Sequence, residues 1–427
     1  MLFMSRRGLR YGQEVLFPVV TTAARSSAMW AAVPAGPPDP ILGLVEAFKE
    51  DPHPDKVVLA AGTYRTDEGT PWVLPSVKEA EARIVASGLD KEYLGITGLA
   101  ALNEAARAFA LGSDSPALKE GRVCSVQTLS GTGACRLIGE FYKTFLGAGA
   151  PFYLPKPSWG NHSKIFAAAG LDVRGYRYWD PKTLGLDLDG MIDDLKEIPD
   201  GSAILLHACA HNPTGVDPTP DEWRTISAAL KGRDVALFFD TAYQGFASGD
   251  AERDAFALRL FEADGHAFAL GQSFAKNFGL YGERVGVLSL LCSDPDEAKR
   301  VESQLKILVR PMYSSPPLSG ARICLEVLKD EKLSAQWRDE CATMANRIIS
   351  MRSALKEALE KQGSVLSWEH VTNQIGMFCY SGLSPSQVDR LRDEFHVYVT
   401  RDGRISMAGV TSHNVDYIAA AIHTVTK

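Results

Sequence analysis

The residues best placed to do chemistry are a lysine and an arginine that follow an apolar, strand-like segment. Lys276 comes six residues after the end of the apolar run 267–270, and Arg284 follows eight residues later among glycines. Burying a lysine near the end of a strand is costly unless its amine has a use. One such use is a Schiff base to pyridoxal phosphate, with the arginine holding the phosphate. This pair therefore suggests a pyridoxal-phosphate enzyme.

Polar residues elsewhere in the chain match the other needs of that cofactor. Asp240 closes an apolar run, and a carboxylate there would keep the pyridine nitrogen protonated. Tyr243 and Asn212 are candidates to contact the ring hydroxyl, and Trp159 is a candidate to stack on the ring. His162 is expected to hydrogen-bond Asp240 from behind. The phosphate requires N–H groups at a helix start, hydroxyls and a cation, and the residues predicted to supply them are Ser130, Gly131, Thr132, Ser273 and Arg284.

Each of these motifs is weak evidence by itself, because each also fits a purely structural role. Most glycine-rich turns like 130–133 only begin a helix, and no Lys-Ser or Lys-Thr follows to make a P-loop. His207 and His211 are four residues apart, but their strand-like context argues against a metal pair, and no metal site is expected. Asp240 alone would serve as a helix cap, and Lys276 alone would extend from a sheet edge into solvent. The prediction therefore depends on the joint pattern and its order along the chain.

A largely parallel sheet is the element expected to position these residues. Short apolar runs alternate with helical patterns between about residues 120 and 295, which indicates an α/β sheet covered on both faces. The expected strands are 151–154, 203–208, 235–240, 267–271 and 285–291, and a helix is expected over 134–145. Because ligands bind at the carboxyl ends of such strands, Asp240, Lys276 and the turn 207–215 should converge.

The two ends of the chain predict a smaller α+β domain. A helix is expected near the N-terminus and a long helix, followed by short strands, in the C-terminal third. The segments concerned are 41–50, 333–362, 374–380, 397–400 and 404–407, with an extended arm over 36–40. The first 25 residues contain four arginines and one acid, Glu14. This composition is typical of an organellar transit peptide, with a disordered tail as the alternative.

Composition excludes several other classes of protein. The formal net charge of −7 argues against a general nucleic-acid binder. No run of about 18 apolar residues occurs, so no membrane-spanning helix is expected. The 7 cysteines are scattered and form no C-x-x-C pair, which indicates free thiols in a reducing compartment.

Taken together, the motifs resemble the class I aspartate aminotransferases, which are fold type I pyridoxal-phosphate enzymes. The similarity runs from about residue 36 to residue 427, and it is strongest over 207–215, 240–246, 273–286 and 402–406. Segments 36–42 and 294–310 resemble the animal mitochondrial form most closely. The resemblance therefore implies a location in the mitochondrial matrix.

The resemblance implies a fold and a division into domains. The fold would be a large pyridoxal-phosphate-binding domain, with a mainly parallel seven-stranded sheet between helices, and a smaller α+β domain. The implied boundaries are 1–25 for the transit peptide, 26–70 for the N-terminal arm and part of the small domain, 71–330 for the large domain, and 331–427 for the small domain with its long linking helix.

The resemblance also implies how substrate is bound. Arg404 would form a two-point pair with the substrate α-carboxylate. Gly62 and Asn212 are implied to border that carboxylate, and Trp159 to lie near the substrate. Tyr93 and Arg310 resemble residues that cross from a neighbouring subunit, with Tyr93 reaching the phosphate and Arg310 gripping the distal carboxylate. A homodimer with shared active sites is therefore expected.

The implied activity is reversible transamination between L-aspartate and 2-oxoglutarate, with Lys276 moving the proton, in amino-acid metabolism and the malate–aspartate shuttle. The expected partners are dicarboxylic amino and keto acids. The alternatives are a broader aromatic or kynurenine aminotransferase and a secondary fatty-acid-binding role. Three departures from the family pattern are Ser315, Gly95 and the segment 60–62. Ser315 stands beside the distal-carboxylate arginine, so it leaves fine substrate preference open.

Overall fold

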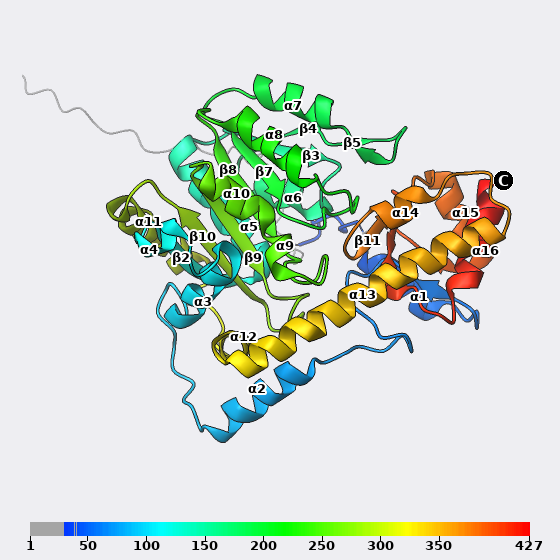
Figure 1. The fold of residues 1–427 in the computed structure, drawn as a ribbon, viewed down its shortest axis with the longest axis horizontal. Coiled ribbons are helices and arrows are strands. Elements are labelled where there is room, and N and C mark those ends of the chain that lie inside the picture. Colours follow the sequence, from blue (N-terminus) through cyan, green and yellow to red (C-terminus); the bar gives the residue numbers. More distant parts are fainter. Residues whose placement is uncertain (1–29, 38, 40) are drawn as a thin grey trace, which may run out of the picture. The chain divides into compact units, whose positions relative to one another are not determined.

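The computed structural model describes residues 30–37, 39 and 41–427 (Figure 1). Contacts divide the chain into residues 1–39 and residues 40–427. In the first unit the described residues form a turn at 30–32 and no helix or strand. The predicted transit peptide, 1–25, lies outside the described residues.

A seven-stranded sheet forms the centre of the second unit (Figure 1). Its order is β2-β10-β9-β8-β7-β3-β4, and β10 runs antiparallel to both neighbours while the remaining pairs are parallel. The bounds are β2 Val123–Leu129, β3 Pro151–Lys156, β4 Asp172–Arg177, β7 Ala203–His207, β8 Ala236–Thr241, β9 Phe268–Ser273 and β10 Val285–Leu291. The predicted α/β class and mainly parallel sheet are confirmed.

The sequence did not predict β2 and β4, which form the two edges of the sheet. β4 alternates exposed and half-buried residues and contains a glycine, so it lacks a continuous apolar run. β2 buries polar residues among its apolar ones, and these polar residues find partners inside the fold. Ser125 Oγ lies 2.8 Å from Ser289 Oγ, and Gln127 Nε2 donates to the carbonyl of Pro317 at 2.7 Å. Hydropathy alone does not reveal such partners.

Helices cover both faces of the sheet. Phe238 belongs to a core cluster with helices α5, α6 and α11, whereas the next residue, Phe239, packs with helices α3, α7, α8 and α10. The bounds are α3 Ala100–Leu111, α4 Pro116–Lys119, α5 Ser130–Leu146, α6 Gly160–Ala168, α7 Leu188–Glu197, α8 Pro220–Leu230, α9 Ala251–Asp254, α10 Phe256–Ala263, α11 Pro295–Met312 and α12 Ser319–Lys329. Because successive strand residues point to opposite faces, both faces must be apolar, as the continuous runs indicated.

The C-terminal third pairs with the start of the second unit. β1 (Val57–Val58) is parallel to β12 (Val397–Tyr398), and β11 (Phe378–Tyr380) is antiparallel to β13 (Arg404–Ser406). The remaining elements are α1 Leu42–Glu50, α2 Pro75–Ala86, β5 Trp179–Asp180, β6 Gly185–Leu186, α13 Glu331–Lys361, α14 Glu369–Asn373, α15 Pro385–Phe395, η1 Met407–Gly409 and α16 Val415–Thr426. The expected long helix and short strands are present, although the strands are shorter than predicted.

One buried cluster joins these parts. It extends from Phe274 and Phe278, beside Lys276, along α13 to Ile418 on α16. Contacts do not divide residues 40–427 further, so the domain boundaries expected at 70 and 330 stay a prediction. In the part of the chain that the structure describes, no helix combines the length and the apolar character needed to cross a membrane.

Candidate active site

Most of the predicted residues converge on a cavity of about 420 Å³ at the carboxyl edge of the sheet. Its volume is typical of sites for small molecules. The predicted residues that line it are Gly62, Ser130, Gly131, Thr132, Trp159, Asn212, Asp240, Tyr243, Ser273, Lys276, Arg284 and Arg404. A larger cavity, of about 640 Å³, lies between α1 and residues 409–417 and contains none of them. The concentration of reactive groups therefore identifies the smaller cavity as the candidate site.

Lys276 follows β9 and its amine is held inside the protein. Its Nζ lies 5.1 Å from the centroid of the Tyr243 ring. Burial lowers the pKa of Lys276, with the charge of Asp240 opposing the shift. The backbone just after the lysine is fixed by α13, because Trp337 Nε1 donates to the carbonyl of Asn277 at 2.8 Å. A lysine with a lowered pKa and a fixed backbone suits nucleophilic and proton-transfer roles.

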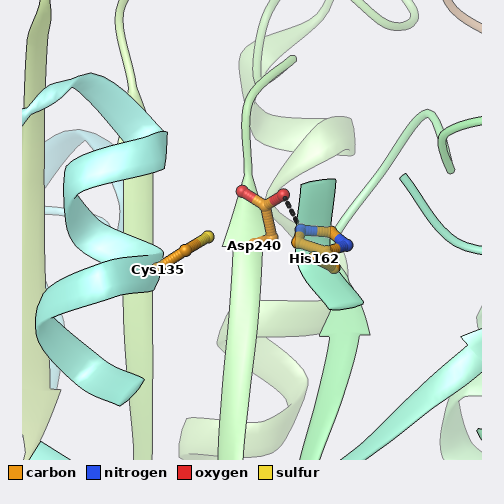
Figure 2. Close-up of side chains that lie close together, drawn as sticks. All are labelled: Cys135, His162 and Asp240. Carbon is orange, nitrogen blue, oxygen red and sulfur yellow. Dashed lines mark hydrogen bonds and ion pairs between the residues drawn. The ribbon is translucent and has the colours of Figure 1, made fainter. Parts of the chain in front are cut away.

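Asp240 lies near the end of β8 and is paired with His162, as the sequence predicted (Figure 2). Its Oδ2 lies 3.0 Å from Nε2 of His162. Burial raises the pKa of this carboxyl, but the hydrogen bond to His162 and the positive charge of Lys276 outweigh it, and the pKa is lowered. Asp240 therefore stays ionised and can pair with a cation in the cavity.

A chain of polar contacts continues behind His162. Ser158 Oγ lies 2.8 Å from His162 Nδ1 and 3.4 Å from His207 Nε2. Burial, with a smaller contribution from His162, lowers the pKa of His207 to about 3 against the opposing charge of Asp240. His207 is therefore neutral, and it orients Ser158 and His162 rather than adding charge. The histidine pair 207 and 211 thus belongs to a neutral buried network.

Cys135, His162 and Asp240 each present one potential ligand atom within 4.8 Å of the others (Figure 2). Cys135 comes from α5 and its sulfur points toward Asp240. Burial raises the pKa of Cys135 well above the usual thiol value, so this group is a thiol and not the thiolate that a metal prefers. We interpret the group as the floor of a pocket for a protonated ring nitrogen.

Another part of the cavity, at the start of α5, is suited to bind an anion. Ser130 is the first residue of α5, and its Oγ lies 3.1 Å from Oγ of Ser273. Ser130 and Arg284 both have left-handed backbones, with φ of 61° and 55°, and Ser130 N donates to the carbonyl of Arg284 at 3.1 Å. Such strain in non-glycine residues is typical of functional sites. The start of α5 with two hydroxyls and a guanidinium suits a phosphate group.

Glycines permit this close approach of β10 to α5. A Cβ on Gly286 would lie 2.5 Å from the carbonyl carbon of Ser130. A Cβ on Gly131 would lie 3.1 Å from Cβ of Ser273. The phosphate-binding corner therefore depends on bare backbone at two positions.

A third region of the cavity contains Arg404, the first residue of β13. Its Nη2 donates to the carbonyl of Ala60 at 2.9 Å, and its Nη1 donates to Oδ1 of Asn212 at 3.3 Å. The residue is 5% exposed, and burial lowers its pKa. Among residues 41–427 it forms no ion pair with a carboxylate, although a guanidinium remains charged in proteins. A buried cation of this kind indicates an anionic ligand.

Sequence reasoning missed some residues of the cavity. Tyr281 lines it, accepts a hydrogen bond from Tyr64 N at 2.9 Å, and has its pKa raised to about 12 by burial. Phe378 lies beneath Arg404, with its ring centroid 4.1 Å from Cζ. Tyr281 stands five residues after Lys276, which is a usable signal, whereas no pattern distinguishes Phe378 from a core residue.

The structure does not bring Tyr93 and Arg310 to the cavity. Tyr93 is 93% exposed in the loop before α3. Arg310 is exposed on the last turn of α11, where Nη1 donates to Oγ of Ser314 at 2.5 Å. A site that uses these two residues needs them from another chain.

The geometry fits pyridoxal phosphate. A buried amine, an ionised carboxylate and an anion-binding helix start border one cavity with Tyr243 and Asn212 between them. Trp159 lies at the start of α6 with its ring 5.1 Å from that of His162. These groups are the ones that the cofactor's aldehyde, ring nitrogen, phosphate and ring oxygen require.

Comparisons with known proteins agree with this site. A family model described as aminotransferase class I and II matches residues 54–422. Mitochondrial aspartate aminotransferase of Xenopus tropicalis is 56% identical over 403 residues, covering 94% of each chain. The enzyme of that name from Gallus gallus is 54% identical over 404 residues, covering 95% of this chain and 96% of the relative. A crystal structure of Burkholderia pseudomallei aromatic-amino-acid aminotransferase, covalently bound to pyridoxal phosphate, is 43% identical with a TM-score of 0.91, covering 94% of this chain and 100% of that chain.

Proposed function

The chain belongs to the class I and II aminotransferases, and we propose that it interconverts L-aspartate and 2-oxoglutarate with oxaloacetate and L-glutamate. The relatives with 54% and 56% identity are named aspartate aminotransferases. The observation that carries the proposal is the buried Arg404, which has no carboxylate partner among residues 41–427 and shares one cavity with Lys276 and Asp240. That arrangement places a carboxylate-binding cation beside the two groups that transamination requires.

The cofactor is pyridoxal phosphate. When bound, it supplies a carbonyl that accepts the amino group and a ring that withdraws electrons from the substrate Cα. Lys276 is the residue that would hold it covalently. Ser130, Gly131, Thr132, Ser273 and Arg284 would hold its phosphate. Asp240 would hold the proton at the ring nitrogen, with His162 keeping the carboxylate oriented and ionised.

The protein's own groups account for binding and proton transfer. Arg404 binds the α-carboxylate and so orients the bond to be broken at Cα. Lys276 Nζ takes the Cα proton as general base, and its lowered pKa increases the fraction of neutral amine available. Trp159 and Phe378 cover the cavity with apolar rings, which limits access of water.

Selectivity for a second carboxylate is proposed to depend on a homodimer. Arg310 and Tyr93 are exposed and outside the cavity of their own chain. We propose that each reaches the site of the neighbouring subunit, Arg310 toward the distal carboxylate and Tyr93 toward the phosphate. In a two-fold dimer this exchange completes two equivalent sites.

The proposed location is the mitochondrial matrix. The curated relatives reported above carry the word mitochondrial in their names. The arginine-rich composition of residues 1–25 supports import and removal of this segment.

Steady-state kinetics test the proposed activity. The purified protein with pyridoxal phosphate is assayed with L-aspartate, L-phenylalanine and L-kynurenine, each with 2-oxoglutarate. We expect kcat/KM for aspartate to exceed the other two by about 10²-fold, because a distal cation adds a desolvated charge pair. Equal values for phenylalanine would replace the proposal with the aromatic alternative.

A further inference from the structure

A buried arginine that the proposed mechanism does not use lies behind the carboxylate-binding region. Arg352, on α13, is 2% exposed. Its Nη1 donates to the carbonyl of Val371 at 2.8 Å, and its Nη2 donates to the carbonyls of Gly376 at 2.8 Å and Phe378 at 2.5 Å. Burying a guanidinium is costly, and its partners among the described residues are backbone carbonyls rather than carboxylates. The buried guanidinium of Arg352 therefore holds the backbone that carries these carbonyls in one position.

That segment, residues 375–378, is called the Phe378 segment below. The ring of Phe378 lies close to Arg404, which is expected to pair with the substrate α-carboxylate, and to Gly62, which is expected to border it. Arg404 Cζ lies 4.1 Å from the ring centroid, and a Cβ on Gly62 would lie 3.2 Å from the ring's Cζ atom. A shift of this ring therefore moves the guanidinium and changes the room beside Gly62.

The Phe378 segment also packs against the turn that carries Asn212. A Cβ on Gly376 would lie only 2.4 Å from Cβ of Ala210, so the two backbones touch. Arg404 Nη1 donates to Oδ1 of Asn212 at 3.3 Å. Both the ring beneath the Arg404 guanidinium and one of its hydrogen-bond acceptors therefore depend on where this segment lies.

We infer that Arg352 is a positioning residue for the substrate α-carboxylate, acting through the Phe378 segment on Arg404. The inference rests on the proposed role of Arg404. Arg352 does not line the cavity, so it contacts neither substrate nor cofactor. Its contribution is the fixed geometry that a two-point guanidinium–carboxylate pair requires.

The test compares two amines in single-turnover half-reactions of the holoenzyme. β-Alanine has the amine and distal carboxylate of aspartate but no α-carboxylate. Arg352→Lys keeps the charge and loses the forked donor geometry. We expect this variant to lower the second-order rate constant of the half-reaction about tenfold for L-aspartate and less than about twofold for β-alanine. Equal losses for both amines would mean a general structural role and would overturn the inference.

Arg347→Lys is the matched control. Arg347 lies on the same helix, and its Nη2 also donates to three carbonyls, those of Thr66, Ala408 and Val410, at 3.1, 3.4 and 3.0 Å. Urea unfolding should show comparable losses of stability for the two variants. The ratio of aspartate to β-alanine reactivity should change only in Arg352→Lys. A similar change of ratio in Arg347→Lys would also overturn the inference.

A double-mutant cycle isolates the route through the ring. Phe378→Leu removes the ring beneath Arg404 and leaves the backbone carbonyl in place. We expect Phe378→Leu to lower reactivity with L-aspartate about fivefold. The double variant with Arg352→Lys should lose no more than about tenfold, because the two changes act on one contact. Multiplicative effects would contradict this route. A wild-type protein inert to aspartate would overturn both the proposed function and the inference, whereas an active wild type with an unchanged ratio in Arg352→Lys would overturn the inference alone.

Discussion

Arg404 and Arg310, the two arginines assigned to the substrate's carboxylates, lie in opposite environments. Arg404 is 5% exposed and held by Ala60 and Asn212 inside the cavity. Arg310 is exposed at the end of α11 and contacts Ser314. On the roles proposed for these arginines, one chain completes the pocket for the α-carboxylate, and the pocket for the distal carboxylate needs a second chain. The difference teaches that, under this proposal, amino-acid binding is a property of the chain, whereas dicarboxylate selectivity is a property of an assembly.

The energetics support this division. An exposed ion pair contributes only about 0–1 kcal/mol, because water already solvates both charges. A desolvated pair costs about 2–5 kcal/mol when one partner is removed. Arg310 can discriminate strongly only when another chain covers it, whereas Arg404 is already covered.

The largest expected effect concerns Lys276, which carries out the chemistry on the substrate that Arg404 and Arg310 are proposed to bind. Lys276→Ala removes the nucleophile and the general base together, so transamination should fall by about 10⁴-fold or more. Turnover is measured by coupled assay, and the visible absorbance of the bound cofactor by spectrophotometry. The absorbance of the covalently held cofactor should also disappear. Retained absorbance and turnover would show that another residue carries the chemistry.

Leucine substitutions of the two arginines should separate their roles. Arg404→Leu should lower kcat/KM by about 10³-fold for aspartate and phenylalanine alike, because both have an α-carboxylate. Arg310→Leu should lower it by about 10²-fold for aspartate and leave phenylalanine within about threefold. The ratio of the two substrates is the measurement. Equal losses of kcat/KM for aspartate and phenylalanine in Arg310→Leu would contradict the separate roles of the two arginines.

Mixed dimers should show directly that the exposed arginine serves a neighbour. Inactive Lys276→Ala and Arg310→Leu chains are unfolded together and refolded as a mixture. Each hybrid has one complete site of two, which combines an intact Lys276 with the partner's Arg310. Because random pairing makes about half of the dimers hybrids, activity should recover to about a quarter of wild type. Each variant refolded alone is the control. No recovery in a mixture that sizing shows to be dimeric would place Arg310 in its own chain's site.

The smallest expected effect concerns the buried residue His207 and the pH dependence of the free energy of unfolding. His207 has its pKa lowered from 6.5 to about 3, chiefly by burial. Between these values the unfolded chain binds more protons than the folded one, so stability is lost as pH falls, by up to about 1.4 kcal/mol per pH unit. His207→Gln should therefore lose less free energy of unfolding between pH 6.5 and 5 than wild type. Urea unfolding at both pH values measures this difference, and identical losses would contradict the assignment.

Two other buried groups oppose this dependence in wild type. Burial raises the pKa of Asp217 and of Asp254 to about 6. Their folded forms bind more protons below pH 6, so they make stability rise as pH falls through that window. Neither is changed by His207→Gln, so the difference between the two proteins isolates the histidine.

The strands that could be predicted are those buried on both faces. β10 spans 285–291 as expected, and the predicted ends of β7, β8 and β9 lie within three residues of the observed ones. β2 and β4 escaped prediction, because β2 buries polar residues with distant partners and β4 lacks a continuous apolar run. The residues of the cofactor pocket were found because strand ends and glycine turns mark them. Phe378 and Arg352 were not found, because a buried phenylalanine or a helical arginine has no distinctive pattern.

The sequence by itself determined the chemistry of this protein. An ionised acid at one strand end, a lysine after another and a glycine turn before a helix specify what the cavity can do, because local patterns place each at the same sheet edge. Only the tertiary structure decided which groups lie within reach of one another. It buried Arg404 against Ala60 and Asn212 and left Arg310 exposed, since burial depends on packing between segments far apart in the sequence.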